Sequence, residues 1–75
     1  MLKAVNIKGY RFGKNADRYF ARGFAILDTE TGDFLAYPAS GIPYILDTKK
    51  VIQSCIDSNF ETILTDRIPY TAKLA

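Results

Sequence analysis

The chain has 75 residues, of which 48% are hydrophobic and 24% are charged, and its formal net charge is +2. This composition excludes intrinsic disorder, and the length predicts a single domain over residues 1–75 with a small core. The single cysteine, Cys55, excludes an internal disulfide and a multi-thiolate metal site, so we expect a cytoplasmic protein. We expect no membrane partner, because no signal-peptide pattern and no apolar run of membrane-spanning length is present.

The charges are divided unequally along the chain. Residues 1–24 carry six basic residues against Asp17 alone, which gives a net charge of +5. Residues 25–75 carry four basic residues against seven acidic ones, which gives −3. Such a division can present a basic face to a polyanion or let two copies of the chain associate head to tail.

The first predicted strand covers residues 1–8, where apolar residues alternate with polar ones. Residues 9–17 are predicted to form a loop, because glycine and asparagine interrupt any regular pattern there. This segment holds two basic residues, Arg11 and Lys14, together with two aromatic residues, Tyr10 and Phe12. It is therefore the segment that we expect to be functional.

Residues 18–37 predict a β-hairpin. In its turn, DTETGD, we expect Asp28 to accept a hydrogen bond from the Glu30 amide and Gly32 to take the left-handed conformation. Pro38 has no N–H and should end the second strand.

The one predicted helix covers residues 48–58. Asp47 is the expected N-cap, Leu46 and Val51 occupy the positions of a hydrophobic staple, and Asn59 suits the position after the C-cap. An apolar stripe at helical spacing should dock on the sheet. It consists of Val51, Ile52, Cys55 and Ile56.

Residues 60–65, FETILT, alternate as a further strand, and Pro69 should end the regular structure. The predicted order is β-β-β-α-β, an α+β fold in which a small antiparallel sheet carries one helix on one face. Nothing in the pattern indicates what covers the opposite face.

Several kinds of chemistry are excluded by residue type. The chain has no histidine, so histidine-dependent nucleophiles, imidazole acid–base catalysis and histidine-ligated metal sites are absent. Cys55 lies on the apolar stripe and is interpreted as a core residue. The carboxylates near Asp28 are interpreted as a solvated turn, because the calcium-loop pattern fails beyond its first positions. We therefore expect a protein that is not an enzyme and has no cofactor or metal.

Residues 22–27, RGFAIL, resemble the start of the RNP1 motif, in which strand aromatics stack on RNA bases. Only 21 residues precede Arg22, too few for the β-α-β unit before RNP1 in an RNA-recognition domain. RGFAIL followed by DFLAYP is also similar to the second and third strands of cold-shock domains, although the predicted helix does not fit their barrel. Three antiparallel strands followed by a helix resemble, in topology, the N-terminal DNA-binding domains of some phage integrases and AP2-type factors. Those resemblances imply nucleic-acid binding through the sheet.

Two orientations of the hairpin remain open. Phe20 and Phe24 can face outward beside Arg22, as a surface for nucleic acid, or they can face the helix as ordinary core, which residue frequencies favour.

The leading hypothesis is a non-catalytic nucleic-acid-binding module. The alternative is a protein-binding module or inhibitor, of the kind encoded on phages and mobile elements, acting as a homodimer or on another protein. The candidate binding residues are Lys8, Tyr10, Arg11, Phe12, Lys14, Arg18, Phe20 and Arg22.

Overall fold

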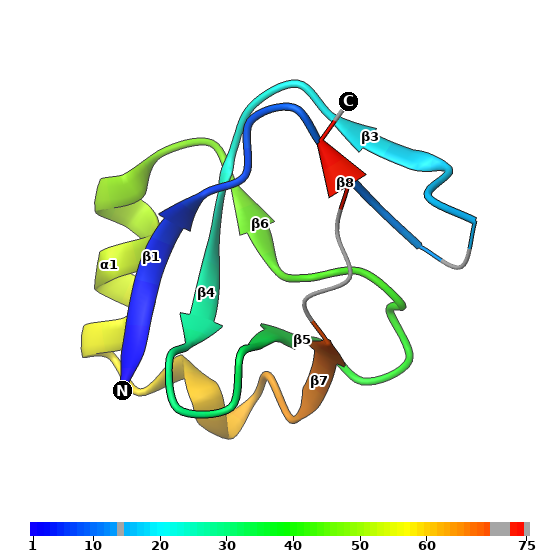
Figure 1. Cartoon of the computed structure of the whole chain (residues 1–75). Coiled ribbons are helices and arrows are strands. Elements are labelled where there is room, and N and C mark those ends of the chain that lie inside the picture. Colours follow the sequence, from blue (N-terminus) through cyan, green and yellow to red (C-terminus); the bar gives the residue numbers. More distant parts are fainter. Residues whose placement is uncertain (14, 70–72, 75) are drawn as a thin grey trace.

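The computed structural model describes residues 1–13, 15–69 and 73–74, and it confirms the α+β class (Figure 1). Its described strands form two antiparallel sheets. The main sheet contains β1 (Leu2–Asn6), β4 (Phe24–Asp28), β5 (Asp33–Ala36), β6 (Ile45–Leu46) and β7 (Asp66–Pro69). The small sheet contains β2 (Tyr10–Phe12), β3 (Arg18–Phe20) and β8 (Lys73–Leu74). The helices are α1 (Lys49–Asp57) and a 3₁₀ turn, η1 (Phe60–Thr62).

The strands of the main sheet are in the order β1-β4-β5-β7, and β6 extends the sheet by pairing with the start of β4. Helix α1 covers one face of this sheet. Ile26 of β4 and Leu35 of β5 are fully buried on that face against Ile52 of the helix. Cys55 is buried in the same cluster, so its interpretation as a core residue is confirmed.

The opposite face of the main sheet is partly covered by the small sheet, on the side away from α1 (Figure 1). The neighbours of Ile26 and Leu35 along their strands, Ala25 and Phe34, project to this side because side chains alternate along a strand. Both are fully buried in a second cluster with Ile7 and Phe12. The small sheet therefore covers part of the face of the main sheet for which the sequence pattern indicated no cover.

The predicted loop at residues 9–17 is wrong in part, because β2 forms within it and pairs with β3. The predicted hairpin strand is also interrupted at residues 21–23. Phe20, before the break, packs in the small-sheet cluster, whereas Phe24, after it, packs on the helix side. The two phenylalanines are therefore on opposite sides of the main sheet, which neither predicted orientation described.

The ends of the helix differ slightly from the prediction. Thr48, and not Asp47, is the N-cap, and its hydroxyl accepts a hydrogen bond from the Val51 amide at 3.3 Å. Val51 is consequently exposed and forms no staple. Asn59 takes the left-handed conformation after the helix, as predicted, with φ of 62°.

The strand predicted at residues 60–65 is wrong, because this segment begins with the 3₁₀ turn η1. The apolar residue Leu64 is buried in the helix-side cluster, while Ile63 is exposed. The last strand of the main sheet, β7, forms later, where Ile68 pairs with Phe34 and Arg67 with Leu35. No helix in the described part of the chain is long and apolar enough to cross a membrane.

An ion pair ties the β4–β5 turn to β7. A guanidinium nitrogen of Arg67 lies 2.7 Å from a carboxylate oxygen of Asp28, and the other oxygen accepts a hydrogen bond from the Glu30 amide at 3.0 Å. The Arg67 hydrogen bond, followed by that of Glu30, lowers the pKa of Asp28 below its ordinary value of 3.8. Because the folded pKa is the lower one, this stabilisation is complete above 3.8 and is lost as the pH falls through the folded value.

Asp28→Asn should therefore reduce the acid sensitivity of the fold. Urea unfolding at about pH 6 and about pH 3 should show a smaller loss of stability for the variant than for the wild type. Asp47→Asn is the matched control, because Asp47 is exposed at the start of the helix and contacts neither Arg67 nor the turn. An unchanged pH dependence in Asp28→Asn would contradict this assignment.

Candidate nucleic-acid interface

Four of the predicted binding cations lie on the small sheet and on the segments that join it to the main sheet. They are Lys8, Arg11, Arg18 and Arg22, and the side chains of all four are exposed. Within the described residues, none of the four is in an ion pair. The fifth predicted cation, Lys14, lies outside the described residues.

Two backbone hydrogen bonds bring Lys8 beside the segment that contains Arg22. The amide of Ile7 donates to the carbonyl of Gly23 at 3.0 Å, and the amide of Gly9 donates to that of Phe20 at 2.9 Å. Lys8 lies between these two bonds on one segment, and Arg22 lies between them on the other. Cations separated by 14 positions in the sequence are thus held side by side at the junction of the two sheets.

Arg11 and Tyr19 form the outer surface of the small sheet. They are cross-strand partners, so their side chains project to the same face, and the Arg11 guanidinium carbon lies 5.0 Å from the centre of the Tyr19 ring. Tyr19 remains 50% exposed. Strand β8 also brings Lys73 opposite Arg11 in the register. This face combines an aromatic ring with a stacked cation, a combination suited to contact with bases and phosphates.

Tyr19 was not among the predicted binding residues. The sequence pattern predicted that Tyr19 lies in the first strand of the hairpin. Its pairing with Arg11 depends on β2, which was predicted to be a loop because residues 9–17 contain glycines. No local signal identifies such a cross-strand pair. The residue became a candidate only through the register.

The predicted aromatic residues of the site are mostly structural. Phe12 is only 3% exposed, and its ring makes edge contacts with Phe34 at 5.6 Å and with Phe20 at 5.9 Å. Phe20 and Tyr10 are half-buried in the same cluster. These rings hold the small sheet on the main sheet, whereas the four described cations are exposed. Phe24 of the RNP1-like segment packs on the helix side and supplies no stacking platform.

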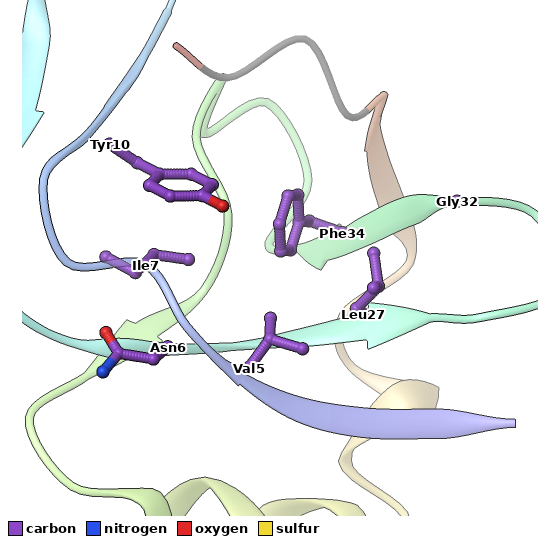
Figure 2. Close-up of a pocket in the computed structure, with 7 residues that line it drawn as sticks. All are labelled: Val5, Asn6, Ile7, Tyr10, Leu27, Gly32 and Phe34. Carbon is purple, nitrogen blue, oxygen red and sulfur yellow. The ribbon is translucent and has the colours of Figure 1, made fainter. Parts of the chain in front are cut away.

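An apolar hollow of about 470 Å³ lies beside the small sheet on the face of the main sheet opposite α1. Figure 2 shows the side chains of Val5, Leu27 and Phe34 around this space, with the ring of Tyr10 forming another wall. The Asn6 side chain points elsewhere, and its carbonyl oxygen accepts a hydrogen bond from the Lys8 amide at 2.8 Å. Ile7 and Gly32 complete the lining among the described residues, and no carboxylate is part of it.

Three of the eight acidic residues gather in one turn away from the small sheet. Asp28, Glu30 and Asp33 belong to the β4–β5 turn, at the end of β4 that is farther from the small sheet. Asp17 lies in the β2–β3 turn among the basic residues, and its carboxylate is directed at Gly13 of the same turn. In the described part of the chain, no group of three or more ligating residues is placed to hold a metal ion.

No family model, curated protein or solved structure matches the chain.

Proposed function

We propose that the chain is a non-catalytic nucleic-acid-binding module that uses the cationic surface of the small sheet. The observation that carries this proposal is the grouping of four exposed cations, Lys8, Arg11, Arg18 and Arg22, that have no ion-pair partner within the described residues. Exposed cations without ion-pair partners attract a polyanion, and phosphate groups release condensed counterions when such cations neutralise them.

The chemistry of the individual side chains agrees with a phosphate partner. Arginine presents a planar fork of donors that matches phosphate oxygens, and three of the four cations are arginines. The exposed ring of Tyr19 adds a surface on which a base can stack beside the Arg11 guanidinium. The net charge of −3 on residues 25–75 would repel the same polyanion and orient it toward the basic part.

Reversing two of these charges should weaken binding strongly. In Arg11→Glu/Arg22→Glu, two phosphate contacts are replaced by repulsion, and we expect affinity for a labelled oligonucleotide at about 50 mM salt to fall by roughly 100-fold or more. Fluorescence anisotropy measures this change, and circular dichroism checks that the variant remains folded.

The matched control is Lys49→Glu/Lys50→Glu, which changes the net charge by the same amount on the exposed first turn of α1. Glutamate is favourable at a helix N-terminus, so this variant should fold. We expect it to lose only the small affinity that a change in net charge causes. Equal losses in the two double variants would refute the assignment of binding to the small sheet.

A second candidate, self-association, is supported by the open edge of β1. Among the described strands, β1 pairs only with β4. The Met1 carbonyl accepts a hydrogen bond from the Thr29 amide, and the Ile7 amide donates one to the Gly23 carbonyl. Because backbone groups alternate in direction along a strand of an antiparallel ladder, those of Leu2, Ala4 and Asn6 point toward the other edge of β1. An unpaired edge of this kind can pair with a second copy.

Light scattering over a range of concentrations should then show a dimer, and Ala4→Pro should abolish it; a monomer at all concentrations would refute this candidate.

A further inference from the structure

Strands β2 and β3 of the small sheet combine arginine with aromatic residues. β2 reads YRF and β3 reads RYF, so neither strand contains an acidic residue. Tyr10, Phe12 and Phe20 pack toward the main sheet. Arg11 and Tyr19, their neighbours along the strands, project to the opposite face because side chains alternate along a strand. The outer face of these two strands therefore presents one aromatic ring beside one guanidinium.

The Arg11 guanidinium and the Tyr19 ring lie close enough to act as one stacking surface. The guanidinium carbon is 5.0 Å from the ring centre, Arg11 is exposed, and Tyr19 is 50% exposed. Nucleobases stack on aromatic rings and on guanidinium planes, and a guanidinium can also donate hydrogen bonds to a phosphate. This pair therefore offers contacts to a base and to a neighbouring phosphate at the same place.

The outer face of β2 and β3 suits the face of a base better than its edge. Reading a duplex in the major groove requires side chains that extend into the groove and hydrogen-bond to base edges, whereas the Arg11 guanidinium lies against the Tyr19 ring. A duplex keeps the faces of its bases stacked inside the helix. A single strand has bases that can be splayed out and stacked on an aromatic ring.

We propose that the nucleic-acid partner is single-stranded, and that one of its bases stacks on the Tyr19–Arg11 pair while the Arg11 guanidinium binds a neighbouring phosphate. Such a contact tolerates any base, because every base has a π-face. This inference rests on the proposed function, because it requires that the chain bind nucleic acid at all.

The wild-type protein can test the inference with three probes at about 50 mM salt. They are a single strand of about twelve nucleotides, its duplex, and an abasic strand of equal length that keeps the phosphates and lacks the bases. We expect the single strand to bind roughly tenfold or more tightly than either of the others. A duplex or an abasic strand that binds as tightly would overturn the inference and leave the proposed function standing. Absence of binding to all three would refute the proposed function and the inference with it.

Substitution of Tyr19 gives an independent test. Tyr19→Leu removes the ring and should weaken binding of the single strand roughly tenfold, whereas Tyr19→Phe keeps a ring and should bind as the wild type does. Affinity for the abasic strand should be the same in all three proteins, because Arg11 and the other cations are retained. If Tyr19→Leu weakened binding of the abasic strand as much as that of the single strand, the ring would act only by holding Arg11, and stacking on a base would be refuted.

Tyr37→Leu is the matched control for loss of an exposed ring. Tyr37 is 42% exposed, and its ring contacts Tyr44, which packs on the helix side of the main sheet. Affinity of this variant for the single strand should equal that of the wild type. Thermal unfolding checks that the three variants are folded, and equal single-strand affinity in Tyr19→Leu and Tyr37→Leu would overturn the inference.

Discussion

Phe34→Ala should reduce the free energy of unfolding by about 3–5 kcal/mol. The ring of Phe34 is fully buried on the face of the main sheet that the small sheet covers, and it contacts the Phe12 ring edge-on at 5.6 Å. Its removal would leave a cavity where the two sheets meet. A 75-residue domain has a total stability of roughly 4–11 kcal/mol, so this single change should remove much of it.

Urea unfolding followed by circular dichroism measures the effect of Phe34→Ala. Phe34→Leu keeps most of the side-chain volume and should retain much of the stability that the alanine variant loses. Tyr37→Ala is a control for loss of an aromatic ring near the end of the same strand, since Tyr37 is 42% exposed. If Phe34→Ala cost no more than Tyr37→Ala, packing between the sheets would not be what holds the small sheet in place.

Gly23→Ala should have the second largest effect, a destabilisation of about 2–4 kcal/mol. Gly23 has a φ of +144°, which side-chain-bearing residues rarely adopt. An added Cβ would lie 2.7 Å from a methyl carbon of Ile45 and 3.3 Å from one of Ile7, both within the buried junction of the two sheets. Backbone strain and steric overlap therefore act together.

Gly41→Ala separates these two causes. Gly41 also has a positive φ, of +75°, but nothing lies within 4 Å of the position that its Cβ would take. We expect a loss of about 1 kcal/mol there, from backbone conformation alone. Thermal unfolding of the two variants under the same conditions gives the comparison, and equal losses would show that the close packing around Gly23 is unimportant.

The features that the sequence predicted correctly depend on neighbours along the chain. In the β4–β5 turn, the Glu30 amide donates to Asp28 and Gly32 takes the left-handed conformation, as the residues DTETGD indicated. The helix was also predicted within one residue at each end, because its stripe and its C-terminal Asn59 are local signals. The N-cap was misplaced by one position because Asp47 and Thr48 are both suitable caps.

The small sheet could not be predicted, because its strands have only two or three residues and are defined by distant partners. Residues 10–12 lie between two glycines, which suggested a loop, and Gly23 gave no sign that a continuous apolar run would break there. The basic charge of the candidate site was evident from composition. The geometry of the candidate site was not evident from composition, since the exposure of Tyr19 and the burial of Phe12 follow from how the small sheet packs on the main sheet.

The salt dependence of binding tests the central claim, that the cationic surface of the small sheet binds nucleic acid. The association constant of the wild-type protein for a single-stranded oligonucleotide would be measured from about 50 to about 300 mM salt. Four cations, each neutralising one phosphate, predict a slope of about −3 in a plot of log affinity against log salt concentration. No binding at about 50 mM salt, or an affinity that does not change with salt, would contradict the claim.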